Sequence, residues 1–358
     1  MVNIVAYYTK GLTDLALAEV EELARAATVV EKTDRFAIIA IPDSDLPPFR
    51  QASRTIDDVR VLVGGPGDIT SLAQFATLCK EAANKTVALI DQDGRAGSGD
   101  WSVTVSARNP VWRRDPEWSP AEVLARELHG ADIDGRRRQP VDLRLQVDEI
   151  RAHVAVNLAA PVKRPGDGRP RPGALRPTVA AAMIRLATNG LPLSTTRLGI
   201  YDPFCGSGTI VAEATAAGLP VFGSDVDEQA VQMTRQRLAA IARDRHTAVV
   251  DIDSLNHRIF PHDVANSLPP RVSARVLVGN MPWGKQVRID RHQELLDATS
   301  ALVAQVLDKG GSAALLTTNE DRFVARLRKQ AKRADVTVRR IGLLGQTPAI
   351  VSVTRARP

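Results

Sequence analysis

The stretch that decides the fold of the second half of this chain is Tyr201-Asp202-Pro203-Phe204-Cys205-Gly206-Ser207-Gly208-Thr209. It lies between a short apolar run and an Ala-rich helical pattern, so it predicts a strand, a glycine-rich turn and the start of a helix. Glycine has no Cβ, which lets a ligand lie against the main chain of such a turn. Dinucleotide-binding turns carry a third glycine where this chain has Val211, and a P-loop needs a lysine that is absent. The turn therefore predicts a ligand site without the features that bind pyrophosphate or triphosphate.

Strands and helices alternate on both sides of this turn. The predicted strands are residues 198–201, 220–224, 259–261, 274–278, 312–317, 336–343 and 350–355. The predicted helices are residues 177–187, 209–217, 228–243, 291–307 and 321–331. Helical connections between strands imply parallel pairing with right-handed crossovers, and the last two strands close as an antiparallel pair. We therefore expect an α/β domain with a mainly parallel, seven-stranded sheet.

Carboxylates follow several of these strands at the edge where open α/β sheets bind ligands. Asp225, followed by Val226, ends the second strand and could accept hydrogen bonds from two ribose hydroxyls. Asp263 ends the third and could accept a bond from an adenine amino group, although it could also be a plain loop carboxylate. Asp202 enters the glycine-rich turn, near where an ammonium group would lie. A ligand with a ribose, an adenine and an ammonium but no phosphate is S-adenosylmethionine.

A second motif, Asn280-Met281-Pro282-Trp283-Gly284, follows the fourth strand. It places an amide, a carbonyl fixed by proline and an aromatic ring at the carboxyl end of that strand. The alternative interpretation is a Pro/Gly turn that only leads the chain out of the sheet.

The first half has a different character. Strands at 3–8, 36–41 and 58–63 with helices at 13–26 and 46–52 predict a small α+β unit, and a new pattern begins near Ile69. Basic clusters lie further on, the last of them in a Pro/Gly-rich stretch. They contain Arg108, Trp112, Arg113, Arg114, Arg136, Arg137, Arg138, Lys163, Arg164, Arg169 and Arg171. Each cluster alone could be a solvated face, but three together, one with a tryptophan, favour an RNA-binding surface.

Bulk composition excludes several classes of protein. The chain has 44% hydrophobic and 25% charged residues, with no apolar run of the roughly 20 residues that a membrane helix needs. Two cysteines cannot form a disulfide framework, and the six scattered histidines suggest no metal site. The first residues lack the pattern of a signal peptide. We therefore expect a cytoplasmic protein without metal or membrane association, and the formal net charge of +6 agrees weakly with a nucleic-acid partner.

Taken together, residues 202–209 and the Asn280 motif resemble the cofactor loop and catalytic motif of amino-group methyltransferases. The similarity is greatest to the THUMP-domain RNA methyltransferases that methylate the N2 amine of guanosine in tRNA, and Leu175-Arg176-Pro177-Thr178 is similar to the helix that precedes their cofactor loop. The resemblance implies a Rossmann-like class I methyltransferase that uses S-adenosylmethionine and tRNA. It also implies four parts: a ferredoxin-like unit at 1–66, a THUMP domain at 67–160, a basic linker at 161–176 and the methyltransferase domain at 177–358.

The same resemblance implies roles for individual residues. Asn280 and Pro282 would accept hydrogen bonds from the target amine, and Trp283 would stack on the base. The residues expected to bind the cofactor are Asp202, Pro203, Cys205, Gly206, Ser207, Gly208, Thr209, Asp225, Val226, Asp263 and Asn280.

Other readings stay open. Many amine methyltransferases have a second proline at the position of Met281 and a tyrosine or phenylalanine at that of Trp283, which leans away from DNA adenine and leaves the exact base open. The alternatives are rRNA guanosine-N2 or DNA adenine-N6 methylation, or an RNA-binding protein with a degenerate methyltransferase domain. A nicotinamide dehydrogenase is disfavoured by Val211. The oligomeric state is undetermined, with a monomer favoured.

Overall fold

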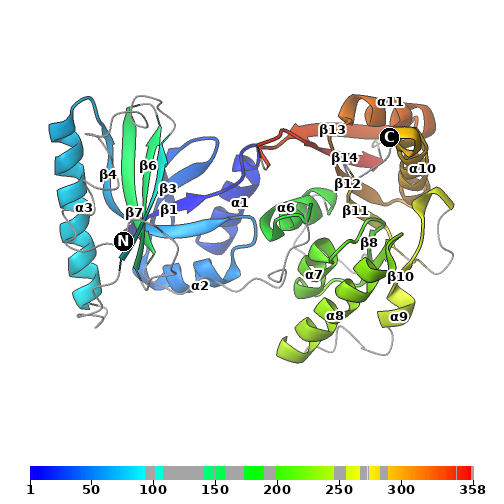
Figure 1. The fold of residues 1–358 in the computed structure, drawn as a ribbon, viewed down its shortest axis with the longest axis horizontal. Helices are drawn as coiled ribbons and strands as arrows, with labels where there is room; N and C mark the ends of the chain where they lie inside the picture. Colours follow the sequence, from blue (N-terminus) through cyan, green and yellow to red (C-terminus); the bar gives the residue numbers. More distant parts are fainter. Residues whose placement is uncertain are drawn as a thin grey trace. The chain divides into compact units, whose positions relative to one another are not determined.

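The structure is a computed structural model that describes residues 1–92, 101–107, 141–148, 150–157, 173–188, 199–245, 255–266, 272, 274–282, 289–343 and 345–355. The chain divides into two compact units (Figure 1). The first consists of Met1–Tyr8 and Leu17–Val162, and the second of Thr9–Ala16 and Lys163–Pro358.

The first unit is built on a seven-stranded sheet in the order β2-β3-β1-β4-β7-β6-β5. Its strands are β1 (Val2–Tyr7), β2 (Thr28–Lys32), β3 (Phe36–Ile41), β4 (Asp58–Asp68), β5 (Trp101–Ala107), β6 (Val141–Asp148) and β7 (Arg151–Asn157). Its helices are α1 (Thr13–Leu23), whose first turn belongs to the second unit, α2 (Leu46–Ala52) and α3 (Leu72–Gln92). β4 pairs antiparallel with β1 on one side and with β7 on the other, so one sheet runs through the expected boundary between residues 66 and 67.

The second unit has the α/β architecture predicted from the sequence. Its sheet has the order β10-β9-β8-β11-β12-β14-β13. The strands are β8 (Ile200–Asp202), β9 (Val221–Asp225), β10 (Ile259–Pro261), β11 (Val276–Asn280), β12 (Ser312–Thr317), β13 (Ala334–Arg340) and β14 (Ala349–Arg355). The first five pair parallel, and β14 runs antiparallel to both β12 and β13. The prediction of a mainly parallel seven-stranded sheet is confirmed.

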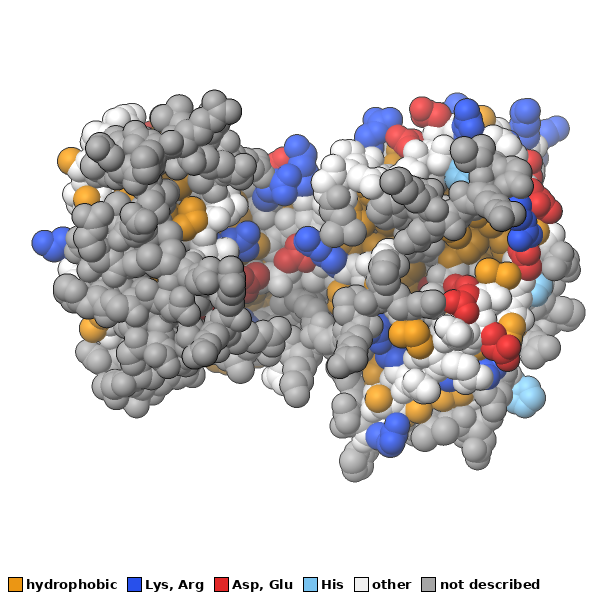
Figure 2. Space-filling model, viewed as in Figure 1, with side chains coloured by type: hydrophobic (Ala, Val, Ile, Leu, Met, Phe, Trp, Pro, Cys, Tyr) orange, Lys and Arg blue, Asp and Glu red, His pale blue; other side chains and the backbone are white. Residues whose placement is uncertain are grey.

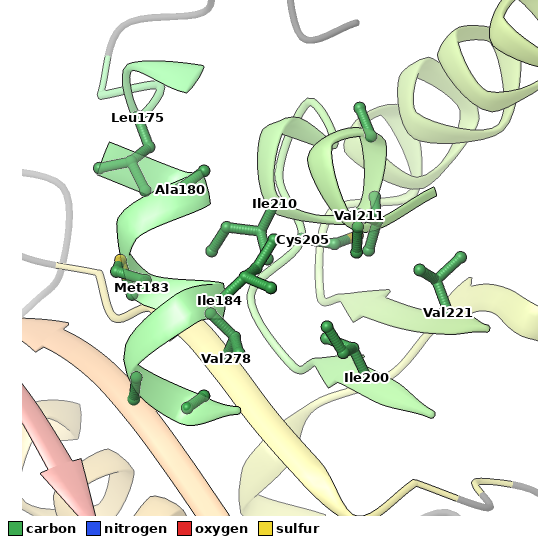
Figure 3. Close-up of a cluster of buried hydrophobic side chains, with 14 of the residues drawn as sticks. Leu175, Ala180, Met183, Ile184, Ile200, Cys205, Ile210, Val211, Val221 and Val278 are labelled. Carbon is green, nitrogen blue, oxygen red and sulfur yellow. The ribbon is translucent and has the colours of Figure 1, made fainter. Parts of the chain in front are cut away.

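Helices cover both faces of this sheet (Figure 1). The helices are α6 (Pro177–Ala187), α7 (Thr209–Ala216), α8 (Glu228–Arg245), α9 (Leu255–Arg258), α10 (Ile289–Asp308) and α11 (Glu320–Gln330). Alternate residues of a strand point to opposite faces. Val276 and Val278 of β11 accordingly join the core beneath α6, α7 and α8, whereas Leu277 joins the core beneath α10 and α11. Figure 3 shows part of the first of these cores, in which Met183 and Ile184 of α6 lie near Val278. Strand β11 is thus buried on both faces, and the carboxyl ends of the parallel strands lie together at one edge of the sheet.

The second unit also contains the short segment Thr9–Ala16. Leu12 is fully buried in the core beneath α6, and the Asp14 carboxylate accepts two hydrogen bonds from the Arg339 guanidinium, at 2.6 and 2.8 Å. The local sequence pattern predicts this segment as part of the N-terminal unit alone. Its apolar and charged contacts are made with residues more than 160 positions away, which local patterns do not reveal.

Candidate functional site

A cavity of about 770 Å³ opens at the carboxyl ends of β8, β9, β10 and β11. The residues that line it include Asp202, Pro203, Phe204, Cys205, Gly206, Ser207, Thr209, Asp225, Val226, His262, Asp263, Asn280, Met281, Pro282, Arg291 and Glu294. On the face shown in Figure 2, the second unit combines an apolar patch with acidic side chains beside it. The site residues predicted from three separate stretches are thus brought together at one edge of the sheet.

Asp225 ties the glycine-rich turn to the end of β9. Its Oδ2 accepts a hydrogen bond from the backbone N–H of Gly206 at 2.9 Å, and its Oδ1 accepts one from that of Asp227 at 3.0 Å. A carboxylate has about four lone-pair sites, so these two bonds fix its plane while leaving capacity for a diol. Gly206 has φ 53°, and a Cβ built on it would have no atom outside the adjacent residues nearer than 3.9 Å. The space that a side chain would fill at Gly206 is therefore part of the cavity.

Gly208, unlike Gly206, does not line the cavity, and its role is in packing. Its φ is 85°, and a Cβ there would lie 2.8 Å from the Thr234 Oγ1 of α8. The same hydroxyl donates a hydrogen bond of 2.8 Å to the carbonyl of Gly206. Gly208 thus lets α8 approach closely enough for Thr234 to hold the turn.

Asp202 is the most buried carboxylate of the cavity wall, with 1% of its surface exposed. Its Oδ1 accepts a hydrogen bond of 3.0 Å from the Phe204 N–H. Burial raises the pKa of Asp202 to about 8; the Phe204 bond opposes this shift and the nearby Asp225 charge adds to it. A cationic group beside Asp202 would favour the ionised carboxylate, so this position suits an ammonium.

Cys205 lines the cavity but belongs to the hydrophobic core, where Figure 3 shows it near Ile210. Burial, reinforced by the charges of Asp202 and Asp225, holds the pKa of its thiol well above the usual value. A protonated, buried thiol is a poor nucleophile, so this cysteine contributes shape to the site.

Asp263 makes an ion pair that the sequence did not indicate. Its Oδ2 accepts a hydrogen bond of 2.7 Å from Arg291 near the start of α10, and its Oδ1 accepts one of 3.1 Å from the Ala265 N–H. Burial opposes ionisation of Asp263, but these bonds and the neighbouring charges outweigh it, so the pKa of the carboxyl is lowered. Arg291 was missed because nothing local links residue 291 to residue 263.

The second motif begins at the end of β11. Asn280 is paired with Leu316 of β12, and its Nδ2 donates a hydrogen bond of 3.3 Å to the carbonyl of Gly173. Met281 is buried in the core beneath α10, while Pro282 lines the cavity. Trp283 and Gly284 lie outside the described residues.

The end of the expected linker forms part of the cavity wall, which the sequence pattern does not indicate. Gly173, Ala174 and Leu175 all line the cavity. The basic residues predicted to bind RNA lie outside the described part of the chain: Arg108, Trp112, Arg113, Arg114, Arg136, Arg137, Arg138, Lys163, Arg164, Arg169 and Arg171.

Two features are absent from the described residues, a metal site and a membrane-spanning helix. Within the ranges given above, no group of three or more His, Cys, Asp or Glu side chains could hold a metal ion. In the same part of the chain, no helix has the length and apolar character needed to cross a membrane.

The chain is similar to several known methyltransferases. The family model described as RMKL-like, methyltransferase domain (UPF0020) matches residues 167–347. The tRNA (guanine(6)-N2)-methyltransferase of Thermus thermophilus is 29% identical over 234 residues, which cover 62% of this chain and 63% of that protein. The tRNA (guanine(10)-N2)-dimethyltransferase of Methanothermobacter thermautotrophicus is 35% identical over 99 residues, or 27% of this chain and 25% of that protein. The chain thus spans less than two thirds of the length of either relative.

Solved structures show the same fold over the whole chain. TrmN from Thermus thermophilus superimposes with a TM-score of 0.71 at 20% identity, covering 99% of this chain and 100% of that one. SMU.472, solved in complex with SAH, superimposes with a TM-score of 0.64 at 14% identity, covering 100% of this chain and 98% of that one.

Proposed function

Because the chain belongs to the RMKL-like methyltransferase-domain family (UPF0020), we propose that it transfers a methyl group from S-adenosylmethionine to the N2 amine of a guanosine in tRNA. The observation that carries this proposal is that Asn280 and Pro282 line the same cavity as Asp202, Asp225 and the glycine-rich turn. An acceptor pair for an amine therefore lies beside a site suited to a cationic nucleoside. The relatives named as tRNA guanine-N2 methyltransferases support the choice of base and substrate.

The residues present fit S-adenosylmethionine by their chemistry. Asp225 would hold the ribose hydroxyls, Val226 would pack against the adenine, Asp263 would accept a bond from its amino group, and buried Asp202 would face the ammonium. Pro203, Cys205, Gly206, Ser207 and Thr209 would form the surface under the ligand, with Gly208 supporting the turn. When bound, the cofactor supplies an electrophilic methyl group on a sulfonium.

The protein's task is to make a weak nucleophile react. The lone pair of a guanine N2 amine is delocalised into the ring. We propose that Asn280 Oδ1 and the Pro282 carbonyl accept hydrogen bonds from its two N–H groups, so that the nitrogen becomes pyramidal. Its lone pair would then form the new N–C bond as the bond between the methyl carbon and the sulfonium sulfur breaks, and the leaving group would be the neutral thioether S-adenosylhomocysteine. The methylated ammonium is acidic and loses a proton to water, so no strong base is needed. Alignment and fixed dipoles then supply most of the rate.

The proposal also concerns RNA. Trp283 would stack on the base, which is worth roughly 1–3 kcal/mol for single-stranded nucleic acid. The basic side chains from Arg108 to Arg171 named above would neutralise phosphates. We also propose a cytoplasmic location and a monomer.

The decisive experiment is methylation of tRNA by the purified protein with labelled cofactor, followed by nucleoside mass spectrometry. We expect N2-methylguanosine from the wild type and almost none from Asn280→Ala, while calorimetry shows that this variant still binds S-adenosylhomocysteine. Turnover close to that of the wild type in Asn280→Ala would overturn the catalytic assignment. Product in rRNA guanosine or DNA adenine instead would identify the alternative substrates, and no product in any of them would favour a non-catalytic RNA-binding protein.

The RNA surface has a separate test. Affinity for tRNA should fall steeply as salt rises, because each neutralised phosphate releases counterions. An affinity that does not change with salt would contradict phosphate contacts.

A further inference from the structure

Asn280 has a fixed backbone but a side chain whose orientation needs a partner. Its main chain is held by the register of β11 with β12, and the next residue, Met281, donates a backbone hydrogen bond of 3.0 Å to Leu316. The terminal torsion of an asparagine is broad and roughly two-fold, so the sheet alone does not decide which end of the amide faces the cavity. A neighbouring hydrogen-bonding group has to decide it.

The carbonyl of Gly173 is such a group. A backbone carbonyl can only accept a hydrogen bond, so the amide must turn its NH₂ end toward Gly173. The observed contact joins Asn280 Nδ2 to the Gly173 oxygen at 3.3 Å. The carbonyl end, Oδ1, is then directed away from Gly173, and Oδ1 is the atom that the proposed reaction needs as an acceptor.

Gly173 itself is held in place by its neighbours. Leu175 is buried in the core and, as Figure 3 shows, lies at the head of α6 near Ala180. The carbonyl of Arg176 accepts the first hydrogen bonds of α6, from the N–H groups of Val179 and Ala180, and Pro177 begins the helix. Gly173 lies two residues before the buried Leu175, and its backbone has φ 82°. This conformation is easy for glycine, tolerated by asparagine and strained for alanine.

We propose that Gly173 is a positioning residue, whose backbone carbonyl sets the orientation of the Asn280 amide and thereby presents Oδ1 to the target amine. The effect of this orientation on catalysis rests on the proposed function, in which Oδ1 accepts a hydrogen bond from the target amine. It makes the last residues of the expected linker part of the catalytic apparatus rather than a passive connection. This hydrogen bond joins two cavity-lining residues that are 107 positions apart in the chain.

The test compares three glycine variants. Gly173→Ala should lower kcat by about 10- to 100-fold, the range expected when a reacting group is misplaced by about 1 Å. Its affinity for S-adenosylhomocysteine should stay within about threefold of the wild type. Gly173→Asn should recover most of kcat, because asparagine accepts a positive φ. Gly218→Ala is the matched control: Gly218 also has a positive φ, 77°, but lies outside the cavity wall, so kcat should be unchanged.

A second readout does not depend on activity. In the complex with S-adenosylhomocysteine, the side-chain NH₂ protons of Asn280, identified by their loss in Asn280→Asp, should exchange slowly with water in the wild type and quickly in Gly173→Ala. Unchanged kcat or unchanged exchange in Gly173→Ala would overturn the inference. If the wild type methylates no tRNA, the proposed function fails, whereas the exchange experiment still decides whether Gly173 orients Asn280.

Discussion

Gly206 and Asp225 are joined by a hydrogen bond of 2.9 Å from the backbone N–H of the first to the carboxylate of the second. This bond connects the turn after β8 to the end of β9, and a second bond from the Asp227 N–H fixes the other oxygen. One carboxylate thus organises the turn and remains at the cavity wall for a ligand. A single substitution of Asp225 should therefore affect both the conformation of the turn and the binding of the ligand.

Asp225→Ala should weaken binding of S-adenosylhomocysteine by at least tenfold, because a hydrogen bond to a charged group contributes about 1.5–3 kcal/mol. Isothermal titration calorimetry measures this change. Asp225→Asn, which keeps the shape and one carbonyl oxygen, should be intermediate. Asp308→Ala, which removes an exposed carboxylate at the end of α10, is the matched control and should bind as the wild type does. Affinity unchanged in Asp225→Ala would contradict the assignment.

Asp202 should make ligand binding depend on pH. With its pKa raised to about 8, the carboxyl is mostly protonated at pH 7 in the free protein, and a bound ammonium favours the carboxylate. Binding should therefore release up to one proton near pH 7, and affinity should increase from pH 6 to pH 8. Calorimetry in buffers with different ionisation enthalpies measures the proton release. Asp202→Asn should abolish it, and a wild type that releases no proton would refute this role.

The same raised pKa predicts how the stability of the free protein varies with pH. Between the ordinary Asp value of 3.8 and about 8, the unfolded chain gives up a proton that folded Asp202 retains. Its contribution to the free energy of unfolding is therefore complete below this window and is lost as pH rises through it. Urea unfolding at several pH values should show this loss in the wild type, and its absence in Asp202→Asn. A contribution that grew with pH would contradict the buried, protonated state.

Gly208→Ala should destabilise the second unit by about 1–3 kcal/mol, since alanine is strained at positive φ and its Cβ would displace Thr234. The free energy of unfolding in urea measures the cost. Gly218→Ala is a close control, because that glycine has φ 77° with nothing within 4 Å of a built Cβ. Gly208→Ala should therefore cost more than Gly218→Ala, and equal costs would show that the approach of α8 is unimportant.

Arg291→Gln should change the free energy of unfolding by less than about 1 kcal/mol, because its ion pair with Asp263 is partly exposed to solvent. The arginine lowers the pKa of Asp263, so the stabilisation should be present at neutral pH and be lost as pH falls and the carboxyl is protonated. Urea unfolding of Arg291→Gln and wild type at pH 7 and in acid checks the sign. A difference that increased in acid would contradict the ion pair.

Local patterns predicted most of the second unit, because the strands are apolar on both faces and the turns carry glycine or proline. β2 was not predicted, since every residue of this edge strand is exposed or only partly buried and leaves no apolar alternation. The bounds of β13 were displaced by two residues at its start for the same reason: it is an edge strand with a largely exposed burial pattern.

The amino-acid sequence by itself determined the order of strands and helices in the second unit, the glycine-rich turn, and the carboxylates and amide that follow its strands. These depend on residues near one another in the chain. Only the tertiary structure decided that burial raises the pKa of Asp202, that Arg291 pairs with Asp263, and that the Asn280 amide donates a hydrogen bond to the carbonyl of Gly173. Burial and hydrogen bonds between distant residues arise from packing, so no local pattern records them.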